Sequence, residues 1–371
     1  MVNRQRKNKL KFFNQTPRVL EPSKKANPMD MLDQAMKVYF EEGILIDIIS
    51  RLPVQSVLRF KCVSKFWKIL IDEPYFKMRH LNHAKNDQNS KTFLCYQQCF
   101  GGFDHPIYSC SLWSTQLVKD THKLNLPLNI EPEYFTISKG CDGLFIINVF
   151  KNTVKNNILL LWNPSTRESM ELPVPEFSLG LSSCLGLSVD SSGDYKILKI
   201  EGNEFGDRKV PGEIFSLENN SWRKIGKHPR VTRNKVPAVD SLAFIHGAFH
   251  WIGINSKTYF VVSFNISHEV FGEISLPKDI GSLNTSNVDI SILEGMLCAY
   301  SNMHDQKMRT FKVWVMRDYN LKESWNAILS IEDRYLLKAT PKYRFANGEI
   351  LFMCAHLHGR DIQFRTKSGP F

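Results

Sequence analysis

The chain has 371 residues, of which 43% are hydrophobic and 23% charged, values that are ordinary for a globular protein and argue against a disordered or fibrous chain. No apolar run reaches the roughly 18 residues that a membrane-spanning helix needs, and the N-terminus lacks the apolar core of a secretory signal. We therefore expect an intracellular protein, cytoplasmic or nuclear or both, with no membrane partner and about two domains.

The formal net charge of +11 is concentrated at the N-terminus. Residues 1–28 hold eight Lys and Arg against one acid, Glu21, so this segment carries +7 and the remainder only +4. A broad basic face for a phosphate backbone is not indicated, and we expect no nucleic-acid partner. We interpret residues 1–38 as a basic, solvated and disordered extension; a nuclear address or an electrostatic tether are the other interpretations.

Three short helices are predicted at residues 41–71. The segment 41–52, "EEGILIDIISRL", places its apolar residues on one broad helical face, with acids at its start and Arg51 at its end, as the helix dipole favours. Pro53 cannot continue this helix but suits the start of a second one. Ser64 is a candidate N-cap for the third, "KFWKILI". Three short helices bury little by themselves, so these wide apolar faces indicate a docked domain or a partner protein.

Residues 40–76, "FEEGILIDIISRLPVQSVLRFKCVSKFWKILIDEPYF", resemble an F-box, the helical module by which substrate receptors attach to the SKP-family adaptor of cullin-based ubiquitin ligases. The core "RLPVQSVLRFKCVSKFW" closely follows the plant version of the motif, although Phe40 and Glu41 replace the usual Leu-Pro and Gly43 stands where an acid is common. We assign the module to residues 39–84. The resemblance implies adaptor contacts by Ile44, Leu45, Ile48, Leu52, Pro53, Val54 and Leu58. The alternative is that these side chains form the module's own core, which is equally well indicated for Ile48 and Leu58.

After residue 90 the pattern changes to short apolar runs separated by turn residues about every dozen positions, which predicts an all-β domain at residues 91–366. Two cassettes recur in it. One strand–turn–strand cassette aligns Trp162, Phe215, Phe264 and Met316; the other begins with a glycine before an apolar strand, at Gly143, Gly186, Gly247, Gly295 and Gly348. A period of roughly 50 residues with four strands per unit is typical of kelch-like propeller blades.

The predicted fold class is therefore α+β and multidomain: a small three-helix F-box followed by an all-β, kelch-like β-propeller. We expect the strands near residues 91–120 and 345–366 to share one terminal blade, because single blades are unstable and the array should close. A β-sandwich is the alternative, but it does not explain the regular spacing.

The β-region also resembles the F-box-associated interaction domain of plant F-box/kelch-repeat proteins and is similar to S-locus F-box proteins. The segments that carry this resemblance are "GCDGLFIINVF", "LLLWNPSTRESMELPVP" and "GLSVDSSGDYKILKI", with "WNPSTRE" the most specific marker. In that marker we expect Asn163, Pro164, Thr166 and Arg167 to shape a turn through side-chain-to-backbone hydrogen bonds, and not to act in catalysis.

The sequence predicts no catalytic residue, no cofactor and no metal site, because it contains no phosphate-binding glycine loop, metalloprotease helix or nucleophile elbow. His356 and His358 share one face of a predicted strand but lack an identified third ligand. The pair Cys95 and Cys99 lacks zinc-site spacing. The remaining cysteines considered, Cys62, Cys141, Cys184, Cys298 and Cys354, are expected to be small buried residues.

The two resemblances imply a substrate-recognition subunit of an SCF-type E3 ubiquitin ligase. Its F-box would dock on the SKP-family adaptor, and through it on cullin, while the β-domain binds an unidentified target protein for ubiquitination. Such a chain supplies proximity and no chemical group. The alternative is a ubiquitin-independent binding module or a metal-assisted enzyme, with N-terminal helices that only pack on the β-domain.

Two long polar segments, 201–213 and 226–240, are candidate target-binding loops, since long loops on rigid scaffolds commonly carry recognition. The second is basic. Its Arg230, Arg233 and Lys235 are the candidate substrate-binding residues, and they favour an acidic partner; solvated loop charge is the alternative.

Overall fold

The computed structural model describes residues 41–87, 92–96, 107–111, 121–128, 134–150, 157–177, 179, 183–202, 211–236, 242–255, 258–277, 280, 286–304, 309–345, 347–356 and 359–367. The predicted basic extension at residues 1–38 lies outside this set. The chain divides into two compact units, Met1–Tyr96 with Pro106–Asn125, and Gln97–His105 with Leu126–Phe371.

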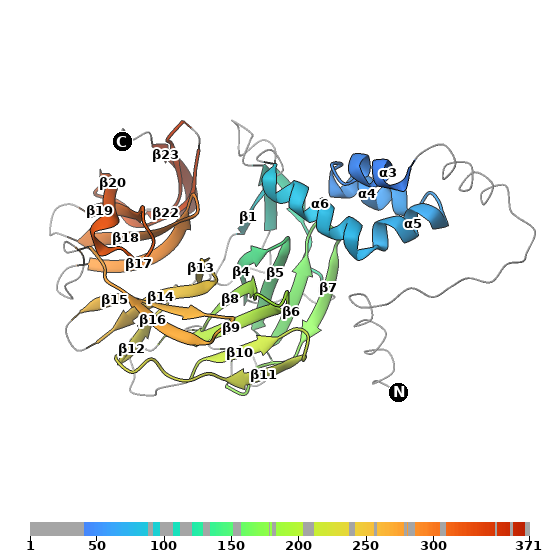
Figure 1. Cartoon of the computed structure of the whole chain (residues 1–371). Helices are drawn as coiled ribbons and strands as arrows, with labels where there is room; N and C mark the ends of the chain where they lie inside the picture. The colour runs from blue at the N-terminus through green and yellow to red at the C-terminus, as the bar shows by residue number, and fades with distance from the viewer. Residues whose placement is uncertain are drawn as a thin grey trace, which may run out of the picture. The chain divides into compact units, whose positions relative to one another are not determined.

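The described part of the first unit contains the helices α3 (Glu42–Ile49), α4 (Val54–Lys61), α5 (Lys65–Asp72) and α6 (Pro74–Asn86), drawn in blue in Figure 1. The first three match the predicted helices, and α6 is a fourth that was not predicted. Pro53 stands at the N-cap of α4, and the backbone N–H of Trp67 donates to Ser64 Oγ (3.4 Å) at the start of α5. Both predicted boundaries are confirmed.

The helices of this unit pack around one small apolar core. Trp67 lies at its centre, with ring centroids 5.4 Å from Phe60 and 5.2 Å from Phe66. The buried members of the core are Leu45, Ile46, Ile49, Val57, Phe66, Trp67, Leu70, Ile71 and Phe76. Ion pairs connect the helix ends; in one of them Lys61 Nζ of α4 lies 2.6 Å from Asp72 Oδ1 of α5. The same unit carries an antiparallel sheet of β1 (Thr92–Tyr96), β2 (Ile107–Ser111) and β3 (Thr121–Leu124).

The second unit is a series of antiparallel sheets, which we call blades 1 to 5 in chain order. Blade 1 is β4 (Tyr134–Cys141), β5 (Leu144–Phe150), β6 (Ile158–Asn163) and β7 (Glu168–Leu172); blade 2 is β8 (Ser183–Val189), β9 (Tyr195–Glu201), β10 (Glu213–Ser216) and β11 (Ser221–Lys224). Blade 3 is β12 (Arg233–Lys235), β13 (Ala243–Ile245), β14 (Ala248–Ile254), β15 (Tyr259–Asn265) and β16 (Val270–Ile274).

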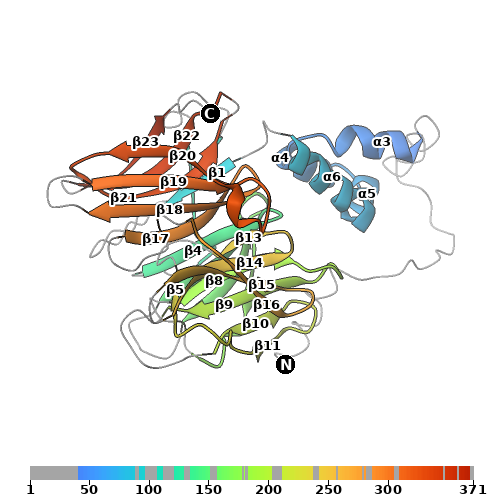
Figure 2. The same cartoon turned by 60° about the vertical axis from the view of Figure 1, so that its left-hand side comes forward.

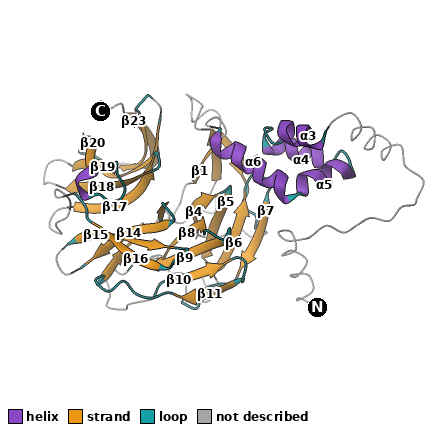
Figure 3. Ribbon diagram, viewed as in Figure 1, coloured by secondary structure: helices purple, strands orange, loops and turns teal. Residues whose placement is uncertain are grey.

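Blade 4 is β17 (Ser286–Leu293), β18 (Met296–His304), β19 (Arg309–Met316) and β20 (Trp325–Glu332), with a 3-10 turn, η3 (Lys322–Ser324), before its last strand. Blade 5 is β21 (Leu336–Arg344), β22 (Ile350–His356) and β23 (Gly359–Lys367). Blades 1, 2, 4 and 5 follow the chain as meanders. In blade 3, β12 and β13 both pair with β14 and together take the place of the first strand, so β14, β15 and β16 are its second, third and fourth strands. Figure 3 draws the strands in orange.

The first strands of successive blades lie next to one another: β4 contacts β8, β8 contacts β13, β13 contacts β17, and β17 contacts β21. Figure 2 shows these sheets following one another from green to red. This is the arrangement of a propeller, and the predicted fold class is confirmed. The predicted shared terminal blade is wrong within the described residues, because β1–β3 pair with one another and β21–β23 form a separate sheet.

Each apolar core of the second unit is built from two successive blades. One cluster joins Leu198 and Ile214 of blade 2 to Phe249 and Val262 of blade 3, and the next joins Val261 of blade 3 to blade 4. The aligned residues of the first cassette are all at most 2% exposed and lie in the third strands: Trp162, Phe215, Phe264 and Met316. A blade therefore buries its faces only when both neighbours are present.

The glycine cassette marks the hairpin between the first and second strands. The positive-φ glycines at this place are Gly143 (79°), Gly193 (90°), Gly247 (73°), Gly295 (73°) and Gly348 (84°). Glycine has no Cβ atom and therefore tolerates this positive-φ conformation. The prediction that Gly186 belongs to this cassette is wrong, because Gly193 is the glycine of the hairpin in blade 2. Gly186 lies inside β8, where a Cβ would come within 2.5 Å of Phe249 Cε1.

The meander gives each blade two unlike ends. The hairpins between first and second strands and between third and fourth strands share one end, which we call the turn end. The connections from second to third strand and from one blade to the next share the opposite end, which we call the loop end. The turn predicted for "WNPSTRE" is confirmed at the turn end of blade 1, where Asn163 Oδ1 accepts from the N–H groups of Ser165 (3.0 Å) and Thr166 (3.3 Å).

We expect Gly186→Ala to destabilise the second unit by about 1–3 kcal/mol, because the added methyl group meets the packed ring of Phe249. The unfolding midpoint in urea, followed by circular dichroism, measures the loss. Gly226→Ala is the matched control, since its Cβ meets no atom within 4 Å. Equal midpoints for the two variants would contradict the packing role of Gly186.

Candidate functional site

The helical module leaves part of its apolar surface uncovered. Ile44 and Ile48, one turn apart on α3, are 49% and 56% exposed. Pro53 is exposed, and Leu52, Val54 and Leu58 are half-buried. These residues come from α3, α4 and the turn between them. In this part of the module, apolar side chains are therefore exposed or only half-buried.

Leu45 is placed differently from the other predicted adaptor residues. Its side chain is 7% exposed and belongs to the module's core, beside Ile46 and Ile49. It packs α3 against the core of the module and is not accessible to a partner. Ile48 differs from Leu45. A place in the module's core was the alternative for Ile48, but more than half of its side chain is exposed.

Four further exposed apolar side chains of the module were missed by the sequence analysis: Val63, Ile69, Tyr75 and Met78. Ile69 is 64% exposed and follows Lys68 on α5. Tyr75 receives a hydrogen bond from Arg79 Nη1 (3.2 Å), and Arg79 also pairs with Asp47 of α3. Sequence periodicity gave no signal for these positions, because Val63 lies in the turn between α4 and α5 and the others neighbour core residues on the same helix.

The second candidate surface is the connection from blade 2 to blade 3, residues 225–236. It contains strand β12, which the sequence analysis interpreted as loop, and β12 lies along β14 with Arg233 opposite Ile254 at the loop end. Two of the candidate substrate-binding residues, Arg230 and Arg233, are exposed. Lys235 is 7% exposed and its Nζ lies 5.8 Å from the centroid of Tyr259, so this ammonium is not offered to a partner.

A pocket of about 60 Å³ lies beneath this connection, between blades 2 and 3. Its apolar lining includes Ile200, Ile225, Val231, Trp251 and Phe271, and its polar lining includes Glu201, Lys227, His228, Thr232 and Asn234. Trp251 Nε1 donates to Asn234 Oδ1 (2.9 Å), which fixes both side chains. Gly226 on its wall has no atom within 4 Å of a would-be Cβ, so this wall faces open space.

Burial shifts the pKa values of two groups of the pocket, Glu201 and His228. Burial raises the pKa of Glu201, and a hydrogen bond from Ser183 Oγ (2.5 Å) opposes that shift only in part. Burial lowers the pKa of His228, although Glu273 opposes the shift. His228 Nδ1 accepts from the N–H of Arg230 (3.3 Å), and its Nε2 lies 3.3 Å from Glu273 Oε1, so the neutral ring carries its proton on Nε2.

A buried ion pair holds the neighbouring wall of blade 2. Lys199 Nζ lies 3.0 Å from Glu213 Oε2, and both side chains are 1% exposed. Lys199 also donates to the carbonyl of Phe177 (2.9 Å), and Glu213 Oε1 accepts from the N–H of Glu176 (3.0 Å). The pair therefore anchors the connection between blades 1 and 2, which is a structural role.

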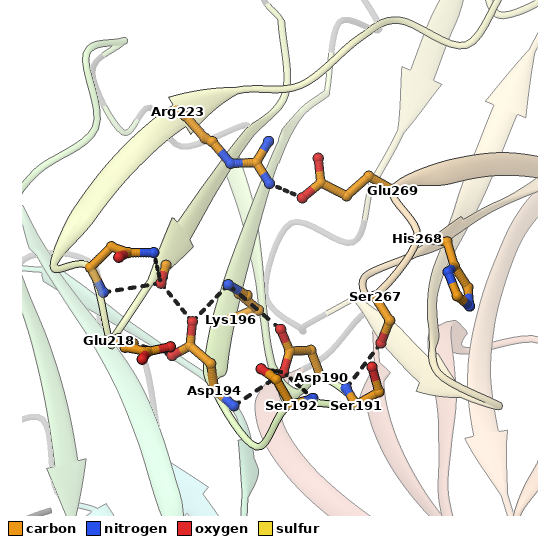
Figure 4. A network of polar contacts seen from close by, with 12 residues as sticks. Asp190, Ser191, Ser192, Asp194, Lys196, Glu218, Arg223, Ser267, His268 and Glu269 are labelled. Atoms are coloured by element: carbon orange, nitrogen blue, oxygen red, sulfur yellow. Dashed lines mark hydrogen bonds and ion pairs between the residues drawn. The ribbon is translucent and has the colours of Figure 1, made fainter. Parts of the chain in front are cut away.

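The turn end of blades 2 and 3 carries a network of carboxylates around a lysine (Figure 4). Lys196 Nζ lies 2.6 Å from Asp194 Oδ2 and 3.6 Å from Asp190 Oδ2. Burial raises the pKa of Asp190, but hydrogen bonds from Ser192 and Asp194 and the charge of Lys196 outweigh it and hold that pKa below its usual value. The ammonium group of Lys196 already neutralises these carboxylates, so the cluster is an internal ion pair and not a metal site.

Contacts between turns join the blades at the same end. The N–H of Ser191 in blade 2 donates to Ser267 Oγ in blade 3 (3.0 Å), and Arg223 pairs with Glu269 (Figure 4). Blades 3 and 4 are joined by His250 Nε2 and Tyr319 Oη, 2.8 Å apart. His250 is fully buried, and burial lowers its pKa to about 4.

The described side chains contain no group of three His, Cys, Asp or Glu residues placed to hold a metal ion. His358 and the side chains of His356, Cys95 and Cys99 lie outside the described set. Cys184, Cys298 and Cys354 are buried as predicted, and burial raises the pKa of the Cys298 thiol to about 12. Cys141 is half-buried and Cys62 is exposed, so the prediction for Cys62 is wrong. None of the described helices has the length and apolar character to cross a bilayer.

Comparison with known proteins covers both units. The model of the F-box associated beta propeller domain matches residues 103–363, and that of the F-box domain matches residues 42–79. The F-box protein At5g49610 of Arabidopsis thaliana is 25% identical over 359 residues, which cover 91% of either chain. The F-box protein CPR1 of the same plant is 27% identical over 316 residues, 78% of this chain and 72% of that relative.

We expect the stability of the second unit to fall as pH drops from about 6.5 to about 4, because His250 is protonated in the unfolded chain before it is protonated in the folded one. At one pKa unit per 1.36 kcal/mol the contribution is at most about 3 kcal/mol. His250→Gln keeps a hydrogen-bonding group for Tyr319 but does not titrate. Urea midpoints measured across this range should converge for the two proteins at low pH; parallel curves would contradict the assignment.

Proposed function

We propose, from the premise that this chain belongs to the F-box proteins with an F-box-associated β-propeller domain, that it is the substrate-recognition subunit of an SCF-type E3 ubiquitin ligase. Its F-box binds a SKP-family adaptor and, through the adaptor, cullin. Its propeller binds a target protein, which is then ubiquitinated and degraded. The chain works in the cytoplasm, the nucleus or both, without a nucleic-acid or membrane partner.

One observation carries the adaptor part of this proposal. The module has a complete core around Trp67 and yet leaves two isoleucines of α3, Ile44 and Ile48, about half exposed and one turn apart. Apolar side chains that a domain's own core does not need are typical of a surface that a partner covers. Leu52, Pro53, Val54 and Leu58 extend this surface from the neighbouring turn and from α4.

The target part is supported by the propeller's division into two ends. Short hairpins close the turn end, whereas longer connections with a pocket and exposed arginines occupy the loop end. Loops on a rigid scaffold suit recognition. In this proposal the chain supplies binding alone, and the ligase partners supply the chemistry, because holding a lysine near a charged ubiquitin carrier raises its effective concentration.

We expect the double substitution Ile44→Asp and Ile48→Asp to weaken adaptor binding at least tenfold, about 1.4 kcal/mol, because two carboxylates would have to be desolvated at the interface. Calorimetric titration of the full chain with a purified SKP-family adaptor measures the change. Val270→Asp, at a side chain 61% exposed on blade 3, is the matched control. Unchanged binding by the double variant, with a normal melting temperature, would contradict the proposed surface.

The same double variant should trap targets in cells. It keeps the propeller but loses the adaptor, so proteins that it captures should accumulate, whereas the parent chain should deplete them. Proximity labelling with quantitative proteomics, with and without proteasome inhibition, measures both effects. Proteins captured equally by the two forms, with abundances that ignore the inhibitor, would argue for a binding module that works without ubiquitin.

A further inference from the structure

The connection from blade 2 to blade 3 concentrates positive charge at the loop end. Residues 225–236 hold the cations Lys227, Arg230, Arg233 and Lys235 and no aspartate or glutamate, and the carboxylates next to them are Glu201 in the pocket wall and Glu273 beside Arg230. At the turn end of the same two blades, carboxylates outnumber cations, with Asp190, Asp194, Glu218 and Glu269 beside Lys196 and Arg223 (Figure 4). An acidic partner is therefore attracted to the loop end of this blade pair and repelled from its turn end.

Arg230 is fixed in place but remains accessible. Its Nη1 lies 2.6 Å from Glu273 Oε2, its Cζ lies 5.8 Å from the centroid of Phe260, and its side chain is still 63% exposed. A guanidinium carries five N–H donors, so one internal carboxylate does not exhaust it. Because Glu273 and Phe260 already hold the side chain, binding a second carboxylate from solvent costs little further rotamer entropy.

The pocket beneath these arginines has an apolar floor and a polar wall. Trp251 and Phe271 contribute aromatic rings to the lining, and about 60 Å³ is room for four or so water-sized spheres, the size of one aliphatic side chain. Glu201 is part of its wall, and burial already raises the pKa of that carboxyl group. The same burial disfavours a second charged carboxylate inside the pocket, whereas it does not disfavour an apolar side chain.

We propose that the loop end of blades 2 and 3 binds a linear acidic segment of the target protein. One aliphatic side chain of that segment occupies the pocket lined by Trp251, and carboxylates on either side of it pair with Arg230 and Arg233. This inference rests on the proposed function only in taking the segment from the target; the surface itself belongs to the propeller and does not need the adaptor.

The probes are three fluorescein-labelled peptides. The first has one leucine between two runs of three glutamates, the second replaces every glutamate by glutamine, and the third replaces the leucine by glycine. Fluorescence anisotropy with the full chain, co-expressed with a SKP-family adaptor and purified by a tag on the chain itself, should give the tightest binding for the first peptide and binding at least tenfold weaker for each of the others. Raising NaCl from about 50 mM to about 300 mM should weaken binding of the two glutamate peptides but not of the glutamine peptide, since screening acts on charge.

Substitutions on the chain separate the two contributions. Arg230→Glu with Arg233→Glu should abolish the preference for glutamate over glutamine. Val231→Ala should weaken the preference for leucine over glycine, because it removes two methyl groups from the apolar lining of the pocket. Arg317→Glu with Lys322→Glu, two exposed cations of blade 4 beyond β19, makes the same charge change elsewhere and should alter nothing. Arg233→Gln alone replaces the double variant if that variant unfolds.

Equal affinity for the glutamate and glutamine peptides, or loss of binding in the blade 4 control equal to that in the arginine variant, would overturn the inference. Capture of the adaptor is measured on the same samples. If the adaptor is not bound but the peptide preferences hold, the proposed ligase function fails and the acidic-segment site stands. If the adaptor is bound and the peptide preferences are missing, the acidic-segment site fails and the proposed ligase function stands.

Discussion

The second unit depends on the burial of each blade's apolar face against the next blade. A four-stranded sheet has two faces, and a single small sheet in water leaves both exposed. Here the buried residues of one blade always share a cluster with those of its neighbour, as Leu198 does with Phe249 and Val261 with Trp314. Gly186 shows how close this approach is, because even a methyl group at that position would meet the ring of Phe249.

Polar contacts then fix how far one blade is rotated against the next. Trp222 Nε1 donates to the carbonyl of Pro173 (2.6 Å), and Trp325 Nε1 donates to that of Ser275 (2.8 Å). In both cases the fourth strand of one blade is tied to the segment that leaves the blade before it. Apolar packing alone is not directional, whereas an indole N–H has one direction, so these bonds give the stack a defined geometry.

The apolar seams hold the loop end of the blades while part of it stays accessible. Its connections contain Leu179, Ile225, Leu242, Leu276 and Ile280, which belong to the buried clusters, whereas Arg230 and Arg233 are exposed. The pocket lining comes partly from strands β9, β14 and β16. The helical module follows the same logic on a smaller scale. Its core residues hold the helices together, and the half-exposed isoleucines of α3 are additional to that core.

The sequence by itself determined the two kinds of structure, the repeat of roughly 50 residues and the turn chemistry, because helix period, strand alternation, Asn–Pro turns and positive-φ glycines are local properties. It did not separate Gly193 from Gly186, since a turn glycine and a close-packing glycine look alike in one chain.

Only the tertiary structure decided which apolar residues are covered. Leu45 and Ile44 are neighbours of equal hydrophobicity, yet one is 7% and the other 49% exposed, because the partners of each come from distant segments. In the same way, Lys235 is buried among residues of blade 3 while Arg233, two positions earlier, faces solvent. The pocket required residues from β9, the 225–236 connection and β14 to meet, and no local pattern encodes that meeting.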